Sequence, residues 1–196
     1  MTDDIFEKKY NDLKNYINIS DEKASQRIAE KLTELNMPVV NKEIVIMCIG
    51  SDRATGDSLG PLVGTLLNKV TNFPYKVYGT LFEPIHAINL DDVYKEIITN
   101  HMNAYILAID ACLGQKKNVG KVIVQAGPIK PGAGVQKELT PVGHAHIKGI
   151  VNISGFMDYL VIQSTRLHDV FMMAEVIRDG IWMYARQNSF ARKNSK

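Results

Sequence analysis

The chain has 196 residues, enough for one domain whose hydrophobic core needs no metal or disulfide support. Hydrophobic residues make up 45% and charged residues 22%, with 14 Gly and 7 Pro, which excludes a disordered or fibrous protein. The formal net charge is +2, and no basic stripe interleaved with aromatic residues occurs, so the composition gives no support to nucleic-acid binding.

The cysteines and the N-terminus predict the compartment. Cys48 and Cys112 are the only cysteines and form no CxxC pair, which favours a reduced cytoplasmic protein. The N-terminal sequence MTDDIFEKKY is acidic and polar, and no run reaches the roughly 18 apolar residues needed to cross a bilayer. We therefore expect a protein that is neither exported nor membrane-spanning.

The N-terminal segment has a helical pattern. Tyr16 and Ile17 lie on the apolar face of a first predicted helix, and a second predicted helix begins after Asp21. We therefore expect an N-terminal helical cover over residues 1–40 and an α/β domain over residues 41–196, within a single compact domain.

From residue 43 onward, short apolar runs alternate with helical patterns. The predicted strands are 43–49, 75–80, 104–109, 121–127 and 149–154, and the predicted helices are 58–70, 90–100, 156–166 and 168–187. The alternation predicts an α/β fold, a three-layer α/β/α sandwich with a mostly parallel or mixed sheet. We expect Asn89 to cap the helix that follows it, strand 104–109 to stop at Asp110, and Phe171 and Trp182 to face inward.

Two aspartates follow predicted strands. Asp57 stands at the start of a helix after the first strand and its polar loop, and Asp110 directly follows an apolar strand. Functional groups gather beyond the carboxyl ends of strands in such sheets, so the two carboxylates face one another if their strands are neighbours. Two close carboxylates share a proton and can supply both a base to activate water and an acid for a leaving group. The pattern fits a hydrolase, although Asp57 could instead cap its helix and Asp110 could stabilise the loop that carries Cys112.

Other motifs give weaker signals. The first loop has an Asp where a phosphate-binding loop needs Lys, and no G-x-G-x-x-G fingerprint occurs there, so nucleotide binding is disfavoured. His144 and His146 are weak candidates for Zn or Ni ligands, and hydrogen-bonded histidines are the simpler interpretation. Cys112 could be a nucleophile, but no base can be assigned to it, so a small buried Cys is favoured.

The segments CIGSDRATGDSLGPLVG, LAIDACLG and GPIKPGAGVQKEL together resemble the YyaC family of sporulation proteins. That family is similar to the spore germination protease, which degrades small acid-soluble spore proteins, and more distantly to hydrogenase maturation endopeptidases. The resemblance implies a phosphorylase/hydrolase-like α/β/α fold and a place in the forespore or spore core. It also implies that Asp57 and Asp110 match the two aspartates regarded as essential in the germination protease.

The resemblance thus favours a peptidase that uses an aspartate pair on a protein or peptide substrate, with small acid-soluble spore proteins as candidates. Ser51, Asp52, Arg53 and Ser58 are the expected substrate-binding residues around the pair. No cofactor is expected, although a third histidine ligand would give the nickel-recognising site of the maturation endopeptidases. The alternatives are a metal-recognising endopeptidase and a non-catalytic binding or regulatory module in the sporulating cell. Methionines in the final helix make a homo-oligomer plausible.

Overall fold

The computed structural model describes residues 16–35, 37, 42–131 and 139–194. Its strands are β1 (Tyr16–Asn18), β2 (Ile44–Cys48), β3 (Lys76–Tyr78), β4 (Tyr105–Gly114), β5 (Lys121–Ala126) and β6 (Ala145–Ile153). Its helices are α2 (Ala24–Glu34), α3 (Leu59–Asn68), α4 (Leu90–Asn100), α5 (Asp158–Gln163) and α6 (Leu167–Asn194), with short 3-10 turns η1 (Gly56–Ser58) and η2 (Lys116–Asn118).

The strands form one mixed sheet in the order β1-β5-β6-β4-β2-β3. Strands β6, β4, β2 and β3 run parallel to one another, whereas β5 is antiparallel to both β6 and β1. The predicted α/β class with a mixed sheet is confirmed. Because β2 and β4 are direct neighbours, their carboxyl ends finish at the same edge of the sheet.

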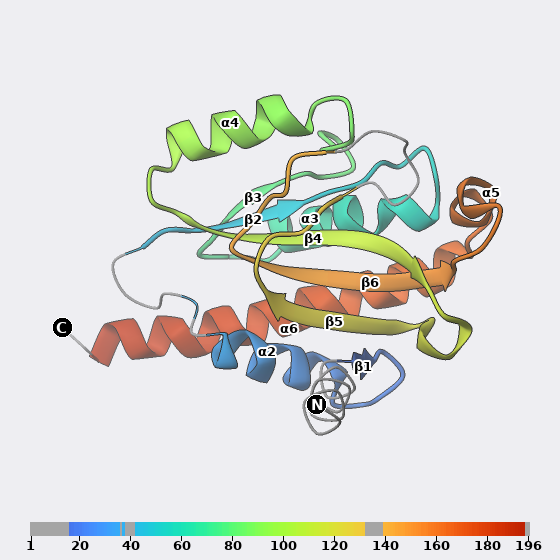
Figure 1. Ribbon diagram of the computed structural model, residues 1–196. Coiled ribbons are helices and arrows are strands. Elements are labelled where there is room, and N and C mark those ends of the chain that lie inside the picture. Colours follow the sequence, from blue (N-terminus) through green and yellow to red (C-terminus); the bar gives the residue numbers. More distant parts are fainter. Residues whose placement is uncertain (1–15, 36, 38–41, 132–138, 195–196) are drawn as a thin grey trace, which may run out of the picture.

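Helices cover both faces of the sheet (Figure 1). One face carries the larger core, where α2, α3 and α6 pack on alternate residues of β2, β4, β5 and β6. The other face carries a smaller core, where α4 packs on Val45, Met47, Ile106 and Ala108. All five residues of β2 are buried, as expected for a strand covered on both faces. The molecule is therefore a three-layer sandwich, and α5 lies at the end of the sheet where β4 and β6 finish.

The first predicted helix does not extend through Tyr16 and Ile17, because residues 16–18 form strand β1; residues 1–15 lie outside the described part of the chain. β1 pairs antiparallel with the outer edge of β5, with Tyr16 opposite Ile123. The pairing gives backbone groups of both strands partners and places Ile17 in the larger core. The second predicted helix is confirmed as α2.

Three local predictions are wrong. β4 does not stop at Asp110 but continues to Gly114, because its ladder with β6 extends through a bulge at Cys112 and Leu113. Asn89 occupies the N-cap position of α4 without capping it, since its side chain accepts from the N–H of His86 and donates to the carbonyl of Pro84. Phe171 is exposed on α6, because it lies beside the buried stripe that contains Val170 and Ala174.

Candidate active site

Asp110 is a carboxyl group set inside the sheet. It lies on β4, on the face of the sheet that also carries α4, and its residue is only 6% exposed. Burial raises the pKa of Asp110 well above its usual value, and the neighbouring charge of Asp57 raises it further. The backbone N–H of Ala111 and the ammonium group of Lys148 act in the opposite direction but do not cancel the shift of the pKa. Asp110 is therefore a carboxyl group that holds its proton unusually strongly.

Asp57 lies in the segment that follows β2, the neighbour of β4, and its charge acts on Asp110. It lies in η1, between β2 and α3, where the chain leaves the carboxyl end of β2. Burial raises the pKa of this half-buried carboxyl, while a hydrogen bond from the Ser51 backbone N–H and the nearby charge of His86 lower it. Because Asp110 is the more deeply buried of the two, we assign the proton of the pair to Asp110 and the negative charge to Asp57.

Glycine makes the loop before Asp57 possible. Gly50 has a φ of 137°, and a Cβ on it would lie 2.0 Å from the backbone carbonyl oxygen of Asp57. The N–H of Ser51 donates to that same oxygen at 3.1 Å. Gly60 approaches the strand as closely, since its Cβ would lie 2.1 Å from the carbonyl oxygen of Ile49. The loop is thus folded tightly against the end of β2, which fixes the position of Asp57.

The four predicted substrate-binding residues occupy different environments in this loop. The hydroxyl oxygen of Ser51 accepts from the N–H of Arg53 at 3.2 Å, and Asp52 and Arg53 are exposed. Ser58 is buried, and its hydroxyl group donates to the carbonyl of Thr55 at 2.6 Å, so this hydroxyl holds the turn of η1. Asp52 and Arg53 are therefore open to solvent, whereas the hydroxyl group of Ser58 is already bonded within the chain.

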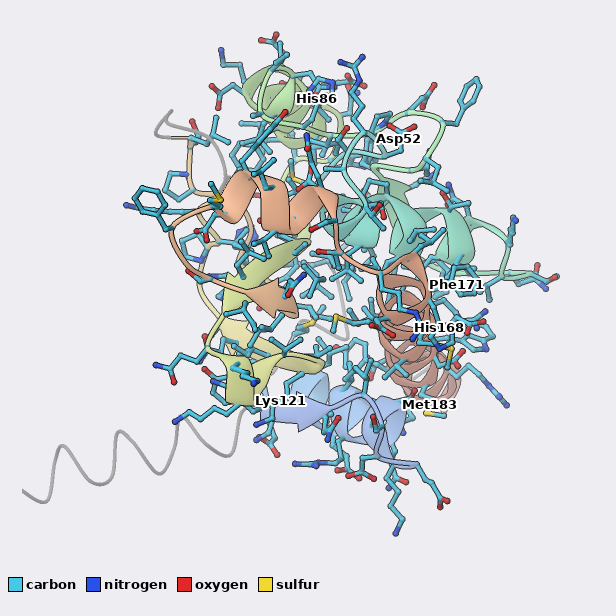
Figure 2. All side chains as sticks on the ribbon, turned by 90° about the vertical axis from the view of Figure 1, so that its right-hand side faces the viewer. Asp52, His86, Lys121, His168, Phe171 and Met183 are labelled. Carbon is cyan, nitrogen blue, oxygen red and sulfur yellow. The ribbon has the colours of Figure 1, made fainter. Side chains whose placement is uncertain are left out.

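His86 lies in the segment that follows β3, the strand next to β2. It follows β3, and Figure 2, which looks onto the end of the sheet beside α5, shows it at the same side of the molecule as Asp52. Its charge lowers the pKa of Asp57, so it lies within electrostatic reach of that carboxylate. It also lines a cavity of about 820 Å³ between β3 and α4, whose other lining residues include Glu83 and Glu96. His86 therefore lines this cavity and also acts electrostatically on Asp57.

The two candidate metal-binding histidines have other partners. His144 stacks on the ring of Tyr105 and accepts from the N–H of Ile106 at 3.1 Å. His146 is buried in β6, and its Nδ1 lies 2.9 Å from the carbonyl oxygen of Gly127. Burial lowers the pKa of His146, which keeps the ring neutral. Within the described ranges, no group of three or more His, Cys, Asp or Glu side chains is arranged to hold a metal ion.

Cys112 lies two residues beyond Asp110 on the same strand. Burial raises the pKa of the Cys112 thiol to about 11, and the charge of Asp110 contributes to the increase. A thiol with this pKa stays protonated at neutral pH, so it is a poor nucleophile. The raised pKa therefore disfavours Cys112 as a nucleophile.

Exposed apolar side chains lie on α5 and its approach and on the segment around His86. None of the residues of α5 is buried although the helix is apolar, and it packs beside η1, where Ile162 and Thr165 contact Gly56. The exposed large apolar residues of these segments are Leu81, Phe82, Ile88, Phe156, Met157, Tyr159 and Leu160. Exposed apolar surface of this kind is typical of a site that binds protein segments.

The sequence analysis did not identify two residues whose charges act on the aspartate pair, His86 and Lys148. His86 stands just beyond the carboxyl end of a strand, which is the position that had identified the aspartates. Lys148 lies one residue before the predicted strand 149–154, whereas β6 begins at Ala145. A strand predicted from Ala145 would have contained this lone charge, which is the signal that could have found it.

No helix in the described residues is long and apolar enough to span a membrane.

Comparisons with known proteins show which family the chain belongs to. The chain is 46% identical over 187 residues to "Uncharacterized protein YyaC" of Bacillus subtilis (strain 168), covering 92% of this chain and 91% of that protein. Among solved structures it is similar to the [NiFe] hydrogenase maturation protease HycI from Thermococcus kodakarensis KOD1. The TM-score is 0.49 at 16% identity, and the match covers 76% of this chain and 99% of the other. A family model described as "Protein of unknown function (DUF1256)" matches residues 16–180, so the chain belongs to the DUF1256 family.

Proposed function

We propose that this protein is a peptidase in which Asp57 and Asp110 hydrolyse a peptide bond. The observation that carries the proposal is the pair itself. A carboxyl group buried inside a strand lies within electrostatic reach of a second carboxyl group, which stands at the mouth of the neighbouring loop. Burying a carboxyl group beside another opposes ionisation, and such pairs are typical of sites where one group must donate and the other accept a proton.

Because Asp110 is protonated and Asp57 is ionised, the two aspartates have different roles in this reaction. The Asp57 carboxylate accepts a proton from a water molecule, whose oxygen forms a bond to the carbonyl carbon of the substrate. The carbonyl electron pair moves to its oxygen and returns as the C–N bond breaks. The Asp110 carboxyl group donates its proton to the departing amine nitrogen. The products are a carboxylic acid and an amine, and the proton on Asp57 then returns to Asp110.

The surroundings support a protein substrate. The exposed apolar side chains of α5, which packs beside η1, and of the loop that carries His86 suit an extended segment of another protein. The motifs shared with sporulation proteins support small acid-soluble spore proteins as the first substrates to try, and the forespore or spore core as the place of action.

The experiment compares the parent protein with Asp57→Asn and Asp110→Asn. Each is incubated with small acid-soluble spore proteins and, separately, with a proteome-derived peptide library, and new termini are identified by mass spectrometry. The parent should give discrete cleavage sites, and each variant should be at least about 100-fold slower, since general acid or base catalysis contributes this much. Asp92→Asn changes an exposed carboxylate of α4 and should cleave like the parent.

Cleavage that persists in both site variants would assign the activity to a contaminant or to other residues. A parent that cleaves nothing in either mixture would reject the peptidase and favour a binding or regulatory role for the fold. Cleavage of library peptides but not of the spore proteins would keep the chemistry and reject only the substrate.

A further inference from the structure

Lys148 lies beside Asp110 on the neighbouring strand. The two residues are direct partners in the parallel ladder between β4 and β6, so their side chains leave the same face of the sheet. Asp57 approaches Asp110 from the opposite side, because η1 follows β2, the other neighbour of β4. The electrostatic neighbours have the same order, since Asp110 interacts with both Asp57 and Lys148, and Asp57 with His86. In the order of the strands that carry or precede them, β3, β2, β4 and β6, these residues form the row His86, Asp57, Asp110 and Lys148.

The direct neighbours of Lys148 on this face of the sheet carry no anionic group. On its other side its ladder partner is Ile123 of β5, and along β6 the next residues on the same face are His146 and Ile150. His146 is held neutral, so it neither repels nor pairs with an ammonium group. The charge of Lys148 acts on Asp110 and also on Cys112, which places the ammonium group over the carboxyl end of β4.

Among the described residues, Lys148 makes no ion pair within 4.0 Å and no side-chain hydrogen bond. Lysines are rarely drawn into a protein interior unless a partner compensates their charge. Here the carboxyl group of its ladder partner, Asp110, holds its proton strongly and is therefore a poor partner for a cation. A half-buried ammonium group beside a protonated acid lacks an anion or a polarised oxygen, and the reaction at this site produces one.

We propose that Lys148 is a third catalytic residue of this site, whose ammonium group donates a hydrogen bond to the carbonyl oxygen of the bond that is cleaved. The proposal rests on the peptidase function proposed above. When water adds to the carbonyl carbon, Asp57 receives the proton of the water and the carbonyl electron pair moves onto the oxygen beside Lys148. When that pair returns, the C–N bond breaks and the amine takes the proton of Asp110. Lys148 keeps its own protons throughout and lowers the energy of the intermediate oxyanion.

The order of the row suits this role. A water molecule between Asp57 and Asp110 attacks from the side of Asp57, and the oxygen that gains charge lies on the far side of Asp110. A fixed positive charge in a partly dry site stabilises such an oxygen more than it does in water, because little solvent screens it.

The test measures kcat and KM of the purified full-length protein on the fastest peptide found in the library experiment. Lys148→Met removes the charge and should lower kcat about 100-fold or more, the loss typical when one oxyanion donor is removed, while KM stays within about threefold. Lys148→Arg restores the charge and the donors and should recover at least about tenfold of that loss. Lys121→Met is the matched control. Lys121 lies on the same face, on β5, beside Tyr16 and Asn118, and Figure 2 shows it at the opposite side of the molecule from Asp52 and His86.

Thermal unfolding of each variant is measured alongside. If Lys148→Met does not fold, Lys148→Gln, which keeps a polar head, takes its place with the same expected loss of kcat. A folded Lys148 variant with the kcat of the parent overturns this inference and leaves the peptidase intact. An arginine variant as slow as the methionine variant also overturns it, because a positive charge would then not be what the site needs. A parent that cleaves no peptide overturns the peptidase and this inference together.

Discussion

At the scale of single residues, Asp110 is the least favourable group in the fold and the most informative one. The carboxyl group lies in a strand interior where apolar residues would be more stable, and its neighbours include another carboxyl group. Proteins hold such arrangements mostly where function requires them. The arrangement has a consequence for stability that can be measured without any substrate.

Replacing Asp110 by Asn should stabilise the protein increasingly as pH rises. The folded-state pKa of Asp110 is raised, so the folded protein binds its proton more tightly than the unfolded chain does. This contribution to stability is complete below the unfolded pKa of about 3.9 and is lost as pH rises through the folded-state pKa. The free energy of unfolding of Asp110→Asn minus that of the parent should therefore increase from pH 5 to pH 9.

Urea unfolding followed by circular dichroism at several pH values measures this difference. The expected gain is about 1.4 kcal/mol for each unit by which the pKa of Asp110 is raised. Asp92→Asn, at an exposed position, should show a flat difference over the same range. A variant of Asp110 that becomes less stable than the parent toward pH 9 would contradict the raised pKa.

At the scale of elements, the segment from Gly50 to Ser58 determines where the first carboxylate stands. Its backbone folds back on itself, with Ser51 and Asp57 joined by a hydrogen bond and Gly50 in a left-handed conformation. The loop is held by the close approach of its backbone at Gly50 and Ser51 to its backbone at Asp57.

Gly50→Ala should therefore disturb the site. A methyl group would meet the carbonyl oxygen of Asp57 at 2.0 Å, and the φ of 137° is unfavourable for any residue with a Cβ. We expect a loss of about 1–3 kcal/mol in the free energy of unfolding and a large loss of peptidase activity, because Asp57 must move. Gly155→Ala is the control, since a Cβ there meets nothing within 4 Å. Equal stability and activity of the two variants would show that the loop is not held as described.

At the scale of the whole molecule, the N-terminal elements belong to the core that supports the sheet. Helix α2 packs along α6, where Ile28 lies against Gly180 so closely that a Cβ on the glycine would be 2.6 Å away. The hydroxyl group of Ser25 donates to the carbonyl of Val176 at 3.1 Å, and β1 completes the sheet beside β5. We therefore propose that residues 16–34 are a necessary part of the fold rather than a detachable cover.

Deleting residues 1–35 should abolish cooperative folding. The deletion removes Ile17, Ile28 and Leu32 from the core, and each such side chain contributes about 1.5–3 kcal/mol, so the sum is comparable to the total stability of a domain, about 5–15 kcal/mol. Calorimetry should show no unfolding transition for the shortened chain. Ile28→Ala should lose about 2–5 kcal/mol, whereas Glu30→Ala on the exposed side of α2 should change little. A cooperative transition in the shortened chain would place the domain boundary after residue 35.

Much of the architecture follows from local patterns. The β-branched run of β2 and the apolar run that begins β4 predict buried strands, and the apolar stripes of α3 and α6 predict helices. These predictions succeed because the spacing of apolar residues along the chain indicates which of them are buried. The alternation of the two patterns predicts the three layers. The position of Asp57 after a strand also follows from the sequence, as does the choice of Asp110 as its partner, and with them the hypothesis that the two carboxyl groups meet.

The pairing of the strands cannot be predicted from local patterns in the sequence. Tyr16 and Ile17 form a strand because the free edge of β5 lies beside them, more than 100 residues further along the chain. Asp110 lies within its strand rather than after it because β6 extends the ladder, and the same register places Lys148 beside it. Register is a property of two segments distant in sequence, so no local pattern contains it. Local patterns therefore predict the layers and the two acids, whereas the pairing of distant strands sets which basic groups stand beside them.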